Sequence, residues 1–125
     1  MNPKKVLVVD DSNLLHRMFE MMLRQYQLVH ARDGREGLDR LAEHKDVGVI
    51  LLDINMPRMN GLEFLGAIKK DPELARIPVV IITTEGTEDD TRRGLEAGAA
   101  AYVKKPFRNE EVVGVIHRLT ASPAA

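Results

Sequence analysis

Short apolar runs rich in β-branched residues alternate along this chain with segments of helical periodicity. Three of the runs, residues 6–9, 47–52 and 79–82, are apolar throughout, as is typical of strands that helices cover on both faces. Two weaker and more polar runs, residues 27–31 and 99–103, suit the edges of a sheet. Five strands alternating with five helices predict an α/β fold, an open, doubly wound parallel sheet with right-handed crossovers.

The segment after the first strand predicts a helix over residues 12–25. Its apolar side chains recur at intervals of four and are expected to form one buried face: Leu14, Leu15, Met18, Phe19, Met22 and Leu23. Met21 and the two methionines of this face are therefore attributed to core packing rather than to a binding groove.

The other helices carry start and stop signals. The second follows a turn at Asp33, the third has Asn60 as candidate N-cap, and Thr87 with Asp90 resembles a capping box for the fourth. Gly98 is predicted at the C′ position that ends the fourth helix. Apolar residues spaced over 112–119 predict the fifth.

Length and composition exclude several classes of protein. The 125 residues suit one domain, predicted over 1–120 with a short flexible tail at 121–125. A formal net charge of -1 gives no overall field for nucleic acid or an anionic membrane, and no apolar stretch is long enough to span a bilayer. The absence of cysteine removes thiolate chemistry and agrees with a reducing compartment, so we expect a cytoplasmic protein.

Polar residues gather where the predicted strands end. Asp10 and Asp11 follow the first strand, Asp53 the third, Thr83 the fourth and Lys105 the fifth. Because ligands bind outside the carboxyl ends of the strands in such sheets, these residues mark a candidate site. Carboxylates this close together repel one another unless a cation neutralises them, and oxygen ligands favour Mg²⁺.

Each of these residues has an ordinary structural explanation when it is taken alone. Asp10 or Asp11 suits a helix N-cap, Lys105 a solvated surface position, and Thr83 a strand residue whose hydroxyl is satisfied locally. Random polar residues would scatter over both ends of the sheet. The placement of all of these residues at the ends of four strands therefore favours a functional site.

The chain resembles the response-regulator receiver domain, the CheY-like family, from Val6 to about Leu119. The resemblance is carried by Asp10-Asp11, residues 52–57 with 60–62, residues 83–85, Gly98-Ala99 and residues 102–107. It implies a flavodoxin-like (βα)5 three-layer sandwich whose parallel strands have the order 2-1-3-4-5.

The resemblance also implies a chemistry. Asp53 would accept a phosphoryl group from the phosphohistidine of a sensor histidine kinase or phosphotransfer protein. Asp11 and Asp53 would hold Mg²⁺ directly, with the Asn55 carbonyl as third ligand and Asp10 acting through water; Mn²⁺ is expected to substitute.

Further residues would receive the phosphoryl group itself. By the same resemblance, Lys105 pairs with one phosphoryl oxygen, Thr83 donates its hydroxyl to another, and the backbone N–H groups of Asn55 and Thr84 complete the site. The peptide bond between Lys105 and Pro106 is expected to be cis.

Signalling would run through Thr83 and Tyr102. By the same resemblance, the hydroxyl would move toward the phosphoryl group and the ring would rotate behind it, which would reshape the surface of the fourth helix, fifth strand and fifth helix for a downstream protein. Without the motif, Tyr102 would be a half-buried aromatic with a solvated hydroxyl. The resemblance also implies that Asn55 and Glu85 occupy positions that tune hydrolysis of the acyl phosphate, and we expect a short-lived phosphoryl group.

Alternative functions remain open at this point. An aspartate-nucleophile phosphohydrolase of the haloacid dehalogenase type requires a second Asp where this chain has Asn55. A flavodoxin-like electron carrier requires a Ser/Thr/Gly-rich phosphate loop after the first strand, which this sequence lacks. We expect no enzyme beyond its own phosphorylation and dephosphorylation, no direct nucleic-acid binding and no membrane insertion. A stand-alone chemotaxis-type or phosphorelay regulator, monomeric or dimerising on phosphorylation, is favoured over a domain excised from a DNA-binding regulator.

Four histidines remain: His16, His30, His44 and His117. They lie on different predicted elements without ligand spacing, so we interpret them as surface residues without a metal or phosphohistidine role.

Overall fold

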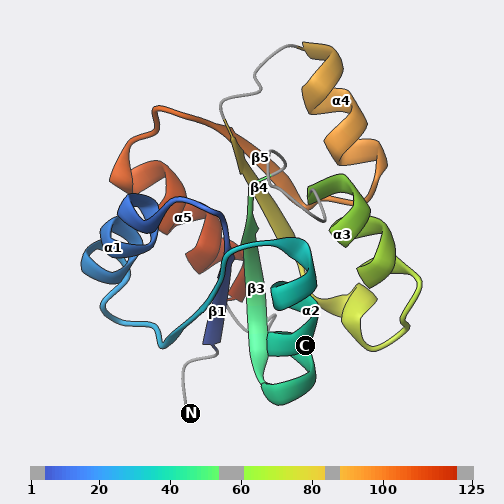
Figure 1. Cartoon of the computed structure of the whole chain (residues 1–125). Helices are drawn as coiled ribbons and strands as arrows, with labels where there is room; N and C mark the ends of the chain where they lie inside the picture. Colours follow the sequence, from blue (N-terminus) through green and yellow to red (C-terminus); the bar gives the residue numbers. More distant parts are fainter. Residues whose placement is uncertain (1–4, 54–60, 84–87, 121–125) are drawn as a thin grey trace.

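The computed structural model describes residues 5–53, 61–83 and 88–120, and its centre is a five-stranded parallel sheet (Figure 1). The strands are β1 (Lys5–Val9), β2 (Leu28–Ala31), β3 (Val47–Leu52), β4 (Val79–Thr83) and β5 (Ala101–Lys104). Their order is β2-β1-β3-β4-β5, which confirms the predicted flavodoxin-like topology and places the two more polar strands at the edges.

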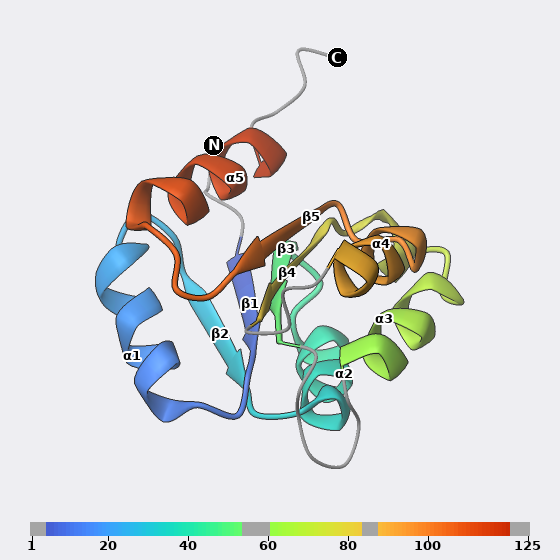
Figure 2. The same ribbon diagram turned by 90° about the horizontal axis from the view of Figure 1, so that it is seen from above.

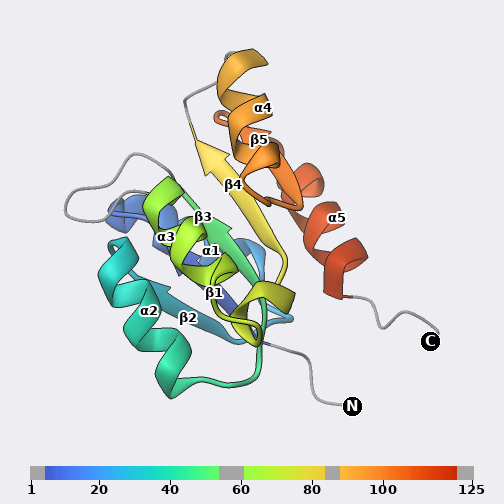
Figure 3. The same ribbon diagram turned by 90° about the vertical axis from the view of Figure 1, so that its right-hand side faces the viewer.

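Helices cover both faces of the sheet. They are α1 (Asn13–Met22), α2 (Gly34–Glu43), α3 (Gly61–Lys69), α4 (Glu88–Glu96) and α5 (Asn109–Thr120), with a 3₁₀ turn at Leu74–Arg76. Seen from above, α1 and α5 lie on one face and α2, α3 and α4 on the other (Figure 2). The view from the side shows the same three layers (Figure 3). No helix within the described ranges has the length and apolar character to span a membrane.

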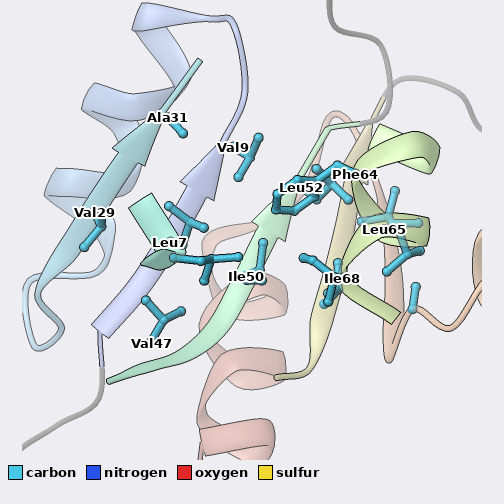
Figure 4. Packing of buried hydrophobic residues seen from close by; sticks show 14 residues of the cluster. Leu7, Val9, Val29, Ala31, Val47, Ile50, Leu52, Phe64, Leu65 and Ile68 are labelled. Atoms are coloured by element: carbon cyan, nitrogen blue, oxygen red, sulfur yellow. The ribbon is translucent and has the colours of Figure 1, made fainter. Parts of the chain in front are cut away.

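Two apolar cores result, one on each face of the sheet. On the face of α2 and α3, Phe64, Leu65 and Ile68 pack against strand residues that include Ile50 and Leu52 (Figure 4). On the other face, α1 and α5 pack against the alternate residues of the same strands. Because every residue of β3 and β4 is buried, these strands need apolar side chains on both faces, which explains their unbroken apolar runs.

The first helix is shorter than predicted and is rotated relative to the expected buried face. It begins after Ser12, whose side chain accepts a hydrogen bond from the Leu15 N–H at 3.2 Å, so Ser12 is the N-cap rather than Asp10 or Asp11. The prediction that Leu14 and Met18 are buried is wrong, since they are 68% and 41% exposed.

The rotation of α1 has a simple physical reason. The six apolar side chains spread over about half of the helix circumference at about 100° per residue, which is wider than the sector that the sheet covers. The covered sector is centred on Phe19 and includes Leu15, Leu23 and the polar His16. It leaves out the opposite edge of the apolar stripe, where Leu14 and Met18 lie. Met21, at 71% exposure, also lies outside the core to which it was assigned, while Met22 is partly buried.

Two of the predicted helix ends are confirmed. The Asp33 side chain accepts from the Glu36 N–H at 2.9 Å and caps α2. Gly98 has φ of 112° after α4, and the N–H groups of Gly98 and Ala99 donate to the carbonyls of Leu95 and Gly94, the pairing of a Schellman motif. The predicted caps Asn60 and Thr87 and the tail at 121–125 lie outside the described residues.

Candidate functional site

An acidic cluster occupies the carboxyl end of the sheet, where β1 and β3 stop. One carboxylate oxygen from each of Asp10, Asp11 and Asp53 lies within 4.8 Å of the other two. Asp10 and Asp53 are buried, at 2% and 7% exposure, whereas Asp11 is exposed. The structure therefore brings together three of the predicted site residues, each placed by the end of a parallel strand.

Lys105, which follows β5, reaches this cluster from the other side. Its Nζ donates to Asp10 Oδ2 at 3.2 Å and lies 3.8 Å from Asp53 Oδ2. The peptide bond from Lys105 to Pro106 is cis, as the resemblance implied. One ammonium faces three carboxylates in this group, so the group carries excess negative charge. An oxygen-only donor set with excess negative charge fits a hard divalent cation.

Asp10 also has a local structural role. Its Oδ1 accepts a hydrogen bond from the Ser12 N–H at 2.8 Å, and its backbone N–H donates to the Ala31 carbonyl at 3.0 Å. The structural interpretation of Asp10 as a residue that satisfies the start of α1 is thus correct in part, although Ser12 provides the cap. Asp10 supports the connection from β1 to α1 and contributes a carboxylate oxygen to the cluster at the same time.

Thr83 and Tyr102 lie on neighbouring strands. Thr83 ends β4 fully buried, and its carbonyl accepts from the Lys105 N–H at 2.8 Å. Tyr102 is half-buried on β5 and packs against the core on the α2 and α3 face. A Cβ added at Gly94 of α4 would come within 3.0 Å of the Tyr102 ring, so the glycine allows the close approach of ring and helix.

Three predicted site residues, Asn55, Thr84 and Glu85, lie outside the described residues. The roles that the resemblance gave them at the cation, at the phosphoryl group and in hydrolysis stay predictions.

The interpretation of the histidines as surface residues is wrong for His16, which is buried and in contact with the partly exposed His30. His16 on α1 is 9% exposed, and its Nδ1 lies 2.7 Å from Nδ1 of His30 on β2. Its Nε2 lies 2.7 Å from the backbone oxygen of Asp10, and His30 Nε2 lies 2.5 Å from Oε1 of Glu20. We call His16, His30 and Glu20 the histidine chain.

Burial lowers the pKa of His16 below its usual value, and the nearby His30 acts in the same direction, although the hydrogen bond to the Asp10 backbone opposes both. His16 is therefore neutral near pH 7. The sequence holds a weak signal for this contact. His16 follows the buried Leu15 on the inner side of α1. His30 directly follows Val29 in β2, so its side chain lies on the opposite face of the strand, which α1 covers.

The comparisons with known proteins agree with one another. The model of the response regulator receiver domain matches residues 6–117. The chemotaxis protein CheY homolog of Campylobacter jejuni is 36% identical over 106 residues, 82% of this chain and 82% of that protein. The structure of the chemotaxis response regulator CheY4 of Vibrio cholerae has a TM-score of 0.85 at 33% identity, and the match covers 93% of this chain and 98% of that one.

A third relative bears on the acidic cluster. The Mn(2+)-bound form of the response regulator Rcp1 has a TM-score of 0.82 at 31% identity, over 98% of both chains. The fold and the acidic cluster define a doubly wound α/β protein with a candidate cation site. The chain belongs to the response regulator receiver family, the CheY-like receivers of two-component signalling. Receiver domains interact with histidine kinases and with downstream targets.

Proposed function

We propose that Asp53 accepts a phosphoryl group from the phosphohistidine of a sensor histidine kinase or phosphotransfer protein, in a reaction that requires Mg²⁺. The observation that carries this proposal is the meeting of three carboxylates with one ammonium at the carboxyl end of the sheet. In the transfer, an Asp53 carboxylate oxygen forms a bond to phosphorus while the bond from phosphorus to the histidine nitrogen breaks. The nitrogen keeps the electron pair.

The residues at the site fit a hard cation. Asp11 and Asp53 would hold it directly and Asp10 through water, and the Asn55 carbonyl, outside the described residues, is the expected third protein ligand. Mn²⁺ is expected to substitute, and the Mn(2+)-bound form of a relative supports this. When bound, the cation neutralises the cluster and offsets the charge of an incoming phosphoryl group.

Lys105 and Thr83 would receive the oxygens of the phosphoryl group. Lys105 Nζ lies 3.8 Å from Asp53 Oδ2, within reach of a group attached to that carboxylate. Phosphorylation adds a charge of roughly −1.5 to −2, and the ammonium provides a charge-assisted partner for it. Backbone N–H groups of Asn55 and Thr84 would complete the set.

The output would pass through Thr83 and Tyr102 to the surface of α4, β5 and α5, where a downstream protein binds. Tyr102 pairs with Ile81 of β4, two residues before Thr83, and its ring borders Gly94 of α4. Movement of the ring therefore changes the packing of α4 against β5. We expect no direct binding of nucleic acid, and a monomer or a phosphorylation-dependent dimer.

The decisive experiment follows the intact mass of the protein with a small phosphodonor, with and without Mg²⁺. We expect one added phosphoryl group that requires the metal, none on Asp53→Asn, and an unchanged gain on the exposed control Asp39→Asn. Phosphate on another residue, or on Asp53→Asn, would contradict the proposal.

Lys105 tests the coupling between the site and the output surface. We expect Lys105→Ala to be phosphorylated and to show a weaker structural response. Amide shifts on addition of a beryllofluoride mimic measure that response around Tyr102. Equal shift changes in the wild type and Lys105→Ala would contradict this role of the lysine.

A further inference from the structure

The histidine chain runs from the exposed side of α1 to the backbone that carries the acidic cluster. His16 contacts the Asp10 carbonyl, His30 contacts His16, and Glu20 contacts His30, over distances of 2.7, 2.7 and 2.5 Å. The two imidazole rings meet edge to face, with centroids 4.7 Å apart and planes at 71°. The histidine chain borders a solvent-open hollow of about 400 Å³.

The hydrogen-bond partners at the two ends of the histidine chain, the Asp10 carbonyl and Glu20, determine which ring nitrogens carry protons. A backbone carbonyl only accepts, so His16 must donate from Nε2, and as a neutral ring it then accepts at Nδ1. His30 therefore donates from Nδ1. Glu20 Oε1 lies 2.5 Å from His30 Nε2 and accepts a hydrogen bond from it, which holds the His30 ring with Nδ1 toward His16.

The Asp10 carbonyl belongs to the peptide unit that joins Asp10 to Asp11. A hydrogen bond to this oxygen restricts ψ of Asp10 and φ of Asp11, which together orient this peptide plane and the Asp11 carboxylate that follows it. The other contacts of Asp10 fix its side chain through Ser12 and Lys105 and its N–H through Ala31. The bond from Ser12 also closes a turn across the following peptide, and His16 holds the carbonyl oxygen of that same peptide, so both contacts restrain its orientation.

We propose that His16 is a positioning residue for the acidic cluster. Its hydrogen bond aligns the peptide between Asp10 and Asp11, so that the two carboxylates are set to hold a divalent cation. His30 and Glu20 keep His16 in the tautomer that donates from Nε2, as outer partners of ligands do at metal sites. The inference rests on the proposed function, because it concerns the cation that phosphorylation of Asp53 requires.

The test compares Mg²⁺ affinities of four variants by titration of amide shifts, on samples whose spectra show the native fold. His16→Leu removes the donor and is expected to weaken Mg²⁺ binding about 10-fold, the lower end of the range for outer partners of metal ligands. His16→Gln keeps an N–H donor at similar reach and is expected to stay within about 3-fold of the wild type. His117→Gln, an exposed histidine on α5, is the matched control and is expected to change nothing.

Glu20→Gln tests the outer part of the chain without touching the core, because Glu20 is exposed. We expect a loss of Mg²⁺ affinity of about 3-fold, smaller than that of His16→Leu. Ring-nitrogen chemical shifts report the tautomer of His16. A purely structural role of Glu20 would leave that tautomer unchanged. We expect His16 of the wild type to be a single tautomer protonated at Nε2, and a second tautomer to become populated in Glu20→Gln.

Three results would overturn the positioning role: wild-type affinity in His16→Leu, an equal loss in His16→Leu and His16→Gln, or a proton on Nδ1 of His16 in the wild type. These are distinct from failure of the proposed function. If the wild type itself neither binds Mg²⁺ nor gains a phosphoryl group on Asp53, the proposed function fails and the positioning role fails with it.

Discussion

Two lysine–aspartate ion pairs of equal length lie at opposite ends of the sheet. At the amino end, Lys5 Nζ lies 3.2 Å from Asp46 Oδ1; at the carboxyl end, Lys105 Nζ lies 3.2 Å from Asp10 Oδ2. The aspartate side chains are 62% and 3% exposed, respectively. The distances are equal, so the surroundings decide what each pair does.

The surroundings differ in solvent and in neighbouring charge. At the amino end, the hydrogen bond from Lys5 lowers the pKa of Asp46, but water surrounds the carboxylate and screens the pair. At the carboxyl end, a second buried carboxylate, Asp53, lies 3.8 Å from the same lysine. Removing a partner leaves a solvated charge at one end and uncompensated buried charge at the other. The following predictions test this difference, beginning with the largest effect.

Mg²⁺ is expected to act on the carboxyl end alone. At a concentration about 100 times its Kd, it should raise the free energy of unfolding by about 2.7 kcal/mol, because it binds the folded chain only. Asp11→Asn should remove most of this gain, whereas Asp46→Asn at the amino end should keep it. Urea denaturation with and without Mg²⁺ measures both, and equal gains in the two variants would contradict a cation site at the acidic cluster.

The lysines should differ in the same sense. Without Mg²⁺, Lys105→Met is expected to lower the free energy of unfolding by about 2 kcal/mol, because it leaves three close carboxylates without their ammonium. Lys5→Met, the matched change at the amino end, is expected to have no measurable effect. Urea midpoints at pH 7 compare the two, and equal losses would show that distance rather than burial governs these pairs.

Acid should destabilise the protein through His16. Its pKa is lowered by burial in the folded state, so the unfolded chain binds the proton first as the pH falls. The stability it contributes is complete above its unfolded pKa of about 6.5 and is lost as the pH falls from there through the folded value. One proton limits the slope to about 1.4 kcal/mol per pH unit.

The control for this loss is a pair of histidine variants. His16→Gln should give a flatter stability curve than the wild type below pH 6.5, and His117→Gln should follow the wild type. Denaturant midpoints between pH 7.5 and 5.5 measure the difference between the curves. A curve of His16→Gln parallel to that of the wild type would show that His16 does not contribute.

The smallest effect is expected at Asp46 alone. Asp46→Asn removes an exposed charge whose pair with Lys5 is screened by water, so the urea midpoint at pH 7 should not move measurably. A loss as large as that of Lys105→Met would remove the contrast between the two ends of the sheet.

Much of this architecture could be predicted because it depends on local patterns. The unbroken apolar runs of β3 and β4 indicate strands buried on both faces, and the more polar β2 and β5 lie at the edges as predicted. The contact of Asp10 and Asp53 could be anticipated for a similar reason. Neighbouring parallel strands end at the same edge of the sheet. The residues that directly follow β1 and β3 therefore lie close together, whichever side chains they carry.

The burial pattern of α1 could not be predicted, because helical periodicity gives the direction of an apolar stripe but not the width that neighbours cover. Leu14 and Met18 fit the spacing and are exposed, while His16 is buried near the other edge of the stripe. Which side is covered depends on how α1 packs on the sheet in the same layer as α5, an element near the other end of the described chain.

The sequence alone determined a doubly wound parallel sheet with an acidic cluster at its carboxyl end, since both follow from periodicity and from where strands stop. Only the tertiary structure decided that His16 meets His30 and that together they reach the Asp10 backbone. That contact requires the rotation of α1 and the register of β2 against β1, which pairs Val8 with His30. Both are set by packing between different elements, and the sequence carries only a weak signal for the contact that results.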